Sequence, residues 1–99
     1  MTKHTISEHT IDRVFGVRGR ESIQAIISGK ETYWSPEIEG GIHVRVSGGL
    51  ASYGNTVDLG KEESSRLLKY VGKKDPKELG SYHVNALYQD KELVGIEFI

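Results

Sequence analysis

The sequence contains no cysteine, which excludes disulfides, thiolate metal sites and cysteine nucleophiles. It also lacks any apolar run long enough to span a membrane. The start, Met1 to Thr5, has no apolar stretch behind Lys3, so we expect no signal peptide. These absences predict a cytoplasmic protein without a membrane partner, in a reducing compartment. Small proteins of this type are common in bacteria and their phages, which is the source we expect.

An excess of either charge is missing as well. The formal net charge is −1. Residues 1–50 carry six Lys/Arg against six Asp/Glu, and residues 51–99 carry seven against eight. The chain therefore has no overall basic field that would attract nucleic acid from a distance. A basic patch would have to come from local arrangement in space.

Motifs that mark common catalytic and cofactor sites are absent. Neither a Gly-x-Ser-x-Gly elbow nor a Walker or Gly-x-Gly-x-x-Gly loop occurs. The four histidines do not follow a metal-ligand spacing; they are His4, His9, His43 and His83. His43 and His83 fall on separate expected strands and would approach each other only if those strands pair. We expect no catalytic residue, no metal site and no cofactor.

The 99 residues fit one domain, 1–99, with its own core. The clearest pattern is a terminal β-hairpin in which Ser81–Tyr88 pairs with Glu92–Ile99 across a polar turn. The side chains that alternate onto the expected core face are Tyr82, Val84, Ala86, Tyr88, Val94, Ile96 and Phe98. Leu87, Leu93 and Ile99 fall on the opposite face, so they either lie under helices or mark a contact surface.

Alternation of Ile42, Val44 and Val46 predicts a strand, with Ser47–Gly49 turning into a second strand at Leu50–Tyr53. Three segments indicate short helices: residues 7–15 behind an N-cap at Ser7, residues 20–28, and residues 57–71. The first of them equally suits a short strand. We therefore expect an α+β fold: a mostly antiparallel sheet of two hairpins with two to three short helices packed on one face.

Tyr33 and Trp34 stand beside Pro36, in a segment that suits a loop or an edge strand. Tyr and Trp dominate the energetics of protein interfaces, so this pair is the leading candidate binding site. The competing interpretation is that both rings fold back as a lid over the sheet.

Arg13, Arg18 and Arg20 form the one local basic cluster, and RNA-binding surfaces use such clusters. Neighbouring acids, Glu8, Asp12 and Glu21, offset this charge, so a solvated surface explains the cluster too. Residues 6–13 also resemble the His-x-x-x-Arg helix that opens some small ribonuclease-toxin-like and phage-encoded proteins. The resemblance rests on His9 and Arg13, and the family's second arginine would fall at Val17.

These patterns favour a non-enzymatic protein-binding module that acts as a regulator, inhibitor or assembly component. Its partner would be another protein, and an exposed sheet edge would also permit a homodimer. The alternative is an RNA-binding or RNA-cleaving small protein that uses His9 with Arg13, Arg18 and Arg20.

Overall fold

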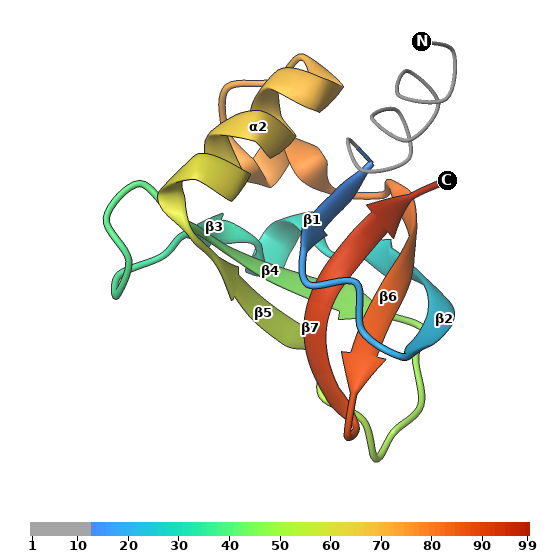
Figure 1. Cartoon of the computed structure of the whole chain (residues 1–99). Helices are drawn as coiled ribbons and strands as arrows, with labels where there is room; N and C mark the ends of the chain where they lie inside the picture. Colours follow the sequence, from blue (N-terminus) through green and yellow to red (C-terminus); the bar gives the residue numbers. More distant parts are fainter. Residues whose placement is uncertain (1–12) are drawn as a thin grey trace, which may run out of the picture.

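The computed structural model describes residues 13–99 as a curled antiparallel sheet, one α-helix and two short 3-10 helices (Figure 1). The strands are β1 (Val14–Gly16), β2 (Glu21–Ile27), β3 (Tyr33–Trp34), β4 (Ile42–Ser47), β5 (Thr56–Leu59), β6 (His83–Gln89) and β7 (Glu92–Phe98). The helices are η1 (Gly29–Glu31), α2 (Lys61–Val71) and η2 (Pro76–Leu79). No helix within residues 13–99 has the length and apolarity needed to cross a membrane.

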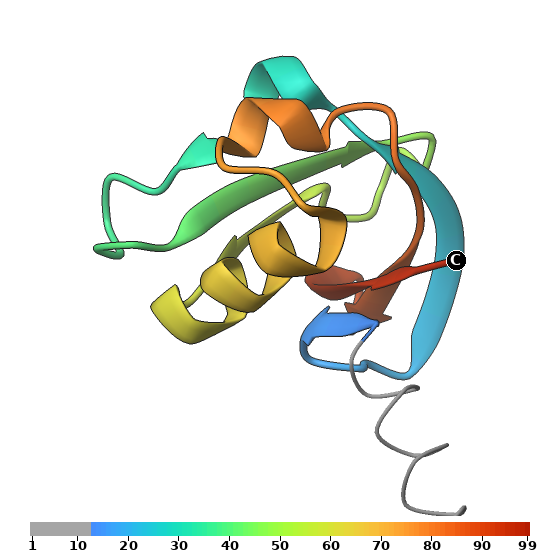
Figure 2. The same ribbon diagram turned by 90° about the horizontal axis from the view of Figure 1, so that it is seen from above.

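The strands follow the order β1-β7-β6-β2-β4-β3, and β5 pairs with the other edge of β4. Strand β2 pairs with β6 along Glu21–Ile26 but with β4 only at Ile26 and Ile27. The sheet therefore folds over at the end of β2 into a half-barrel (Figure 2). The core lies inside this curl, where inward side chains of both halves meet.

The expected fold of two hairpins with two to three helices on one face is wrong. The described chain has a single α-helix, which lies at one end of the curled sheet with η2 (Figure 1). Residues 20–28, expected as a helix, are mostly strand β2. The isoleucine spacing fits a helix, but Ala25 and Ile27 alternate toward the core and Ile23 packs beside them. β-Branched residues fit such a half-buried strand well.

The segment 57–71 divides into two elements. Val57 and Leu59 belong to β5, and the helix begins only at Lys61, behind Gly60. Strand β5, and not the expected Leu50–Tyr53, is the hairpin partner of β4. Of the expected helix 7–15, Val14 and Phe15 are extended in β1, and residues 7–12, with His9, lie outside the described residues.

The terminal hairpin is confirmed, with Asp90 and Lys91 both at positive φ in its turn. Two neighbouring left-handed residues twist a two-residue turn in the sense that suits a hairpin. One detail of the prediction is wrong. Tyr88 pairs with Leu93 but Leu87 with Gly95, so Val94 is an extra residue, a β-bulge. The bulge shifts the alternation and turns Leu93, instead of Val94, into the core.

The free edge of β1 is covered by side chains of α2. The Gly16 amide donates to Glu63 Oε1 (2.8 Å), and Arg66 donates to the Val14 carbonyl (2.6 Å). Glu63 and Arg66 also pair with each other at 3.0 Å, and the Arg66 guanidinium lies 4.4 Å from the centre of the Phe15 ring. One outward donor and one outward acceptor of this edge are therefore occupied by α2.

The close approach of β1 and Val17 to β7 depends on Gly95. A Cβ atom there would lie 2.2 Å from the Val17 carbonyl oxygen and 2.7 Å from the Val17 amide nitrogen, both backbone atoms that no rotamer change can move. The Val17 amide donates to the carbonyl of the bulge residue Val94 (2.8 Å). The missing side chain thus lets β1 approach β7 beside the bulge.

We expect Gly95→Ala to lower the free energy of unfolding by at least about 2 kcal/mol, because backbone must move to admit the methyl group. The matched control is Gly60→Ala, since a Cβ at Gly60 meets no atom within 4 Å. As an N-cap change it should cost less than about 1 kcal/mol. Urea unfolding of both variants measures the difference. Equal decreases in the free energy of unfolding would contradict this account of the close approach at Gly95.

Candidate functional site

The outer face of β4 carries a cross-strand row made by Tyr33, His43 and Asp58. The Val46 amide donates to the Asn55 carbonyl (2.8 Å) on the β5 side. Because backbone groups alternate in direction along a strand, those of Val44 and Ile42 also point toward β5, whereas those of His43 point away from it. His43 and Asp58 are therefore a non-hydrogen-bonded pair, the type in which opposing side chains come closest. Their side chains meet, with His43 Nδ1 2.7 Å from Asp58 Oδ1.

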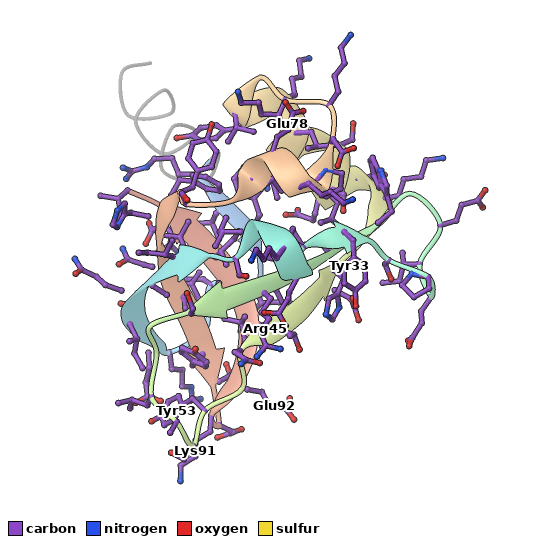
Figure 3. All side chains as sticks on the ribbon, turned by 180° about the vertical axis from the view of Figure 1, so that it is seen from behind. Tyr33, Arg45, Tyr53, Glu78, Lys91 and Glu92 are labelled. Atoms are coloured by element: carbon purple, nitrogen blue, oxygen red, sulfur yellow. The ribbon has the colours of Figure 1, made fainter. Side chains whose placement is uncertain are left out.

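Tyr33 completes this row from the other side of β4. Its ring stacks on the His43 imidazole with a centroid distance of 4.9 Å and an interplanar angle of 22°. Two residues further along β4, Arg45 Nε lies 3.2 Å from Glu31 Oε1. Figure 3 shows Tyr33 and Arg45 on the same face of β4. The row is thus an array of aromatic and polar groups in which His43 and Arg45 each face an acidic side chain.

Trp34 points to the opposite face of the sheet. It pairs with Ile42, whose side chain is fully buried in the core, whereas Tyr33 pairs with His43 on the outside. Tyr33 is 44 % exposed and Trp34 is 48 % exposed. The two rings therefore flank a short strand from its two sides, and neither is a buried lid. Ser35 and Pro36 follow, and of the loop or edge strand that the sequence suggested for this segment, the structure shows a short strand.

The arginine cluster is only partly brought together. Arg18 and Arg20 line one shallow depression of about 240 Å³ with Glu21, Leu87 and Glu97. Arg18 Nη1 lies 3.7 Å from Glu97 Oε2. Arg13 is exposed but does not line that depression; it precedes β1, where its carbonyl accepts from the Phe98 amide. Acidic groups thus share the surface on which Arg18 and Arg20 lie.

The two described histidines lie apart, His43 on β4 and His83 on β6. His43 and His83 do not meet, because β2 lies between β4 and β6. Within residues 13–99, no three His, Asp or Glu side chains cluster as metal ligands would. The sequence analysis did not find the His43–Asp58 pair, because it assigned Asp58 to the first turn of a helix. The alternation of Val57 and Leu59 on either side of Asp58 is the signal that indicates a strand here.

At the opposite end of the sheet, Tyr53 and Tyr88 pack edge to face with a centroid distance of 5.0 Å. The Tyr53 hydroxyl donates to the Glu21 carboxylate at 3.3 Å. Burial raises the pKa of Tyr53, and the Glu21 carboxylate raises it further. Burial also raises the pKa of Tyr88, with a smaller contribution from Tyr53. Figure 3 places Tyr53 beside Lys91 and Glu92, where the Gly54 amide donates to the Lys91 carbonyl (2.8 Å).

Comparison with known proteins gives no relative from which to transfer a function: no family model, no curated protein and no solved structure matches this chain.

In an alkaline titration we expect Tyr53 and Tyr88 to ionise above the ordinary value of 10.0. Because folding favours their neutral forms, this contribution to stability is complete below pH 10 and is lost as the pH rises through the raised pKa values. Glu21→Gln should lower the pKa of Tyr53, since a nearby negative charge disfavours a second one. Resolved NMR signals of the tyrosine Cζ carbons measure both.

Glu37→Gln is the matched control, because Glu37 lies in the segment between β3 and β4 and contributes to neither shift. It should leave both titrations unchanged. An unchanged Tyr53 titration in Glu21→Gln would show that the carboxylate does not act on this hydroxyl.

Proposed function

We propose that the chain is a non-enzymatic protein-binding module whose partner packs on the β3 edge through Tyr33 and Trp34. The observation that carries the proposal is that both aromatic rings are about half exposed on a paired strand and not in a free loop. Exposed Trp and Tyr side chains are enriched among the residues that supply most of the binding energy at protein interfaces. A partner that binds along β3 can contact Tyr33 on one face of the strand and Trp34 on the other.

The fixed position of Tyr33 adds to the argument. Its ring rests on His43, and the Asp58 carboxylate holds that imidazole in turn. A side chain already held in one place loses less conformational freedom when a partner binds. The His43–Asp58 pair therefore has a role in this proposal that needs no chemistry: it preorganises the contact residue.

The charges around the aromatic rings favour a protein partner over a nucleic acid. His43 faces Asp58, and Arg45 faces Glu31. A phosphate backbone arriving here would compete with carboxylates already in place, and phosphate contacts supply most of the affinity for nucleic acids. We propose that the partner is met in the cytoplasm, in keeping with the cysteine-free sequence.

RNA binding through the arginines is the second candidate, because Arg18 and Arg20 do line one depression. It is the weaker one, since Glu21 and Glu97 line the same depression. Binding that weakens steeply with salt and is lost in the triple variant with Arg13, Arg18 and Arg20 changed to Ala would support it instead.

The proposal predicts that a partner recovered from the native host binds Trp34→Ala and Tyr33→Ala at least about tenfold more weakly than the unaltered chain. Each substitution removes one ring from one side of β3, so the two variants report on the two sides separately. Isothermal titration calorimetry with the purified partner measures the dissociation constants.

Leu50→Ala is the control for these variants, since Leu50 is an exposed apolar residue in the loop between β4 and β5. It should bind like the unaltered chain. If both aromatic variants retained full affinity, or if Leu50→Ala lost as much, the partner would not be seated on β3.

A further inference from the structure

A second surface, at the far end of β4, presents unpaired backbone groups. Strand β4 accompanies β2 only at Ile26 and Ile27 and then ends at Ser47. Gly48, at φ +94°, ends the strand beside Ala25, and the segment that follows meets β2 again through side chains, where the Tyr53 hydroxyl donates to the Glu21 carboxylate. Among residues 13–99, no strand pairs with this edge of β2 before Ile26.

The direction of the backbone groups follows from the hydrogen bonds at the end of β2. The Ile27 amide donates to the Tyr82 carbonyl (3.0 Å), and the Ile27 carbonyl accepts from the Ser81 amide (2.8 Å). The Ser28 amide donates the other way, to the Arg45 carbonyl (2.8 Å). Because the groups alternate along a strand, Ile23 and Ala25 face β6, whereas Ser22 and Gln24 direct their N–H and C=O groups outward.

A hollow adjoins this edge on the outer face of the sheet. Its volume is about 490 Å³, and Gln24, Ile26, Gly48, His83 and Ile99 are among the residues that line it. Ile26 and His83 are direct partners in the β2–β6 register, and Ile99 follows β7 beside them. Ile26 is 38 % exposed and Ile99 is 68 % exposed, so the hollow presents aliphatic surface to solvent.

We propose that this edge of β2 binds an extended segment of another protein, which adds as a strand along Glu21–Ala25. The outward groups of Ser22 and Gln24 are two donors and two acceptors at the spacing that only an extended backbone matches. Alternate side chains of the added strand point to the outer face, and an aliphatic one there fills the hollow over Ile26. The ligand class is thus a short extended peptide with an aliphatic residue.

The outer edge of β1 and the open part of the β2 edge differ in how their backbone groups are paired. Glu63 and Arg66 occupy the Gly16 amide and the Val14 carbonyl of β1, whereas none of the described residues donates to or accepts from the outward backbone groups of Ser22 and Gln24. The edge of β2 also lacks the lysine, proline or bulge that commonly protects an exposed strand. It is therefore available to a partner strand.

An extended peptide fits this edge better than a second copy of the chain. In a two-fold β2–β2 pair, the segment 48–55 that follows β4 in each copy would adjoin the other copy as well. A peptide brings no folded body to the same place, and it needs only the length of Glu21–Ala25. The contact is separate from the β3 edge, so it stands or falls independently of the proposed function.

The test begins with a displayed library of random ten-residue peptides selected against the full chain. We expect selected peptides to carry aliphatic residues at alternate positions, and fluorescence anisotropy with a labelled peptide gives the affinity. Gln24→Pro should weaken binding about tenfold, because it deletes one outward N–H donor and leaves the donors toward β6 in place. Gln24→Ala is the matched control, since it keeps the amide and should bind within about threefold of the unaltered chain.

Amide hydrogen exchange on the unaltered chain tests the same site without a substitution that could disturb folding. The Ser22 and Gln24 amides should exchange fast in the free chain and slow with the peptide bound, while the Ile23 and Ala25 amides are protected throughout. Three outcomes would overturn the proposal: no peptide is selected, bound peptides protect amides elsewhere, or the chain alone protects Ser22 and Gln24 by dimerising at high concentration. Trp34→Ala should leave peptide binding unchanged, which separates this site from the β3 edge.

Discussion

The double pairing of β2 at Ile26 and Ile27 is the constraint on which the rest of the structure depends. Up to this point β2 is bound to β6, and here it also takes β4 as a partner. The two halves of the sheet are joined across β2 only through this short overlap. They must therefore fold toward each other, and the inward residues of β4 and β6 then share one core. Among the described residues, the same short overlap leaves the first half of β2 without a paired strand on one side.

The remaining edges are arranged around this curl. Gly95 and the bulge at Val94 let β1 lie against β7, and α2 then covers β1 with Glu63 and Arg66. At the other end of the sheet order, β3 carries Tyr33 and Trp34 on its two sides. Both proposed contacts, at β3 and at β2, lie where this sheet ends or interrupts its pairing. Edges offer backbone and side chains together, and that combination suits recognition of proteins.

The sequence patterns predicted some parts of this arrangement and misjudged others for identifiable reasons. The terminal hairpin was predictable because apolar residues alternate in the sequence from Tyr82 to Tyr88 and from Val94 to Phe98, on either side of a polar turn. The isoleucines of β2 were misread because Ile23, Ile26 and Ile27 satisfy a helical spacing while serving two faces of a strand. Asp58 was misread because an acid before a helix suits a first helical turn as well as a strand. In the candidate site, Tyr33 and Trp34 were found from residue type alone, and His43 with Asp58 was not.

The sequence by itself determined composition and local pattern: a cysteine-free chain with balanced charge, a terminal hairpin, a helix ending at Val71 and an aromatic pair beside Pro36. The tertiary structure decided which strand pairs with which, and hence the neighbours of every side chain. Pairing between β2 and both β4 and β6 joins residues far apart in the chain, and local propensity carries no information about such contacts. Pairing of β3 with β4 places Tyr33 on His43 and turns Trp34 to the other side, and the short overlap of β2 with β4 leaves the backbone groups of Ser22 and Gln24 facing outward.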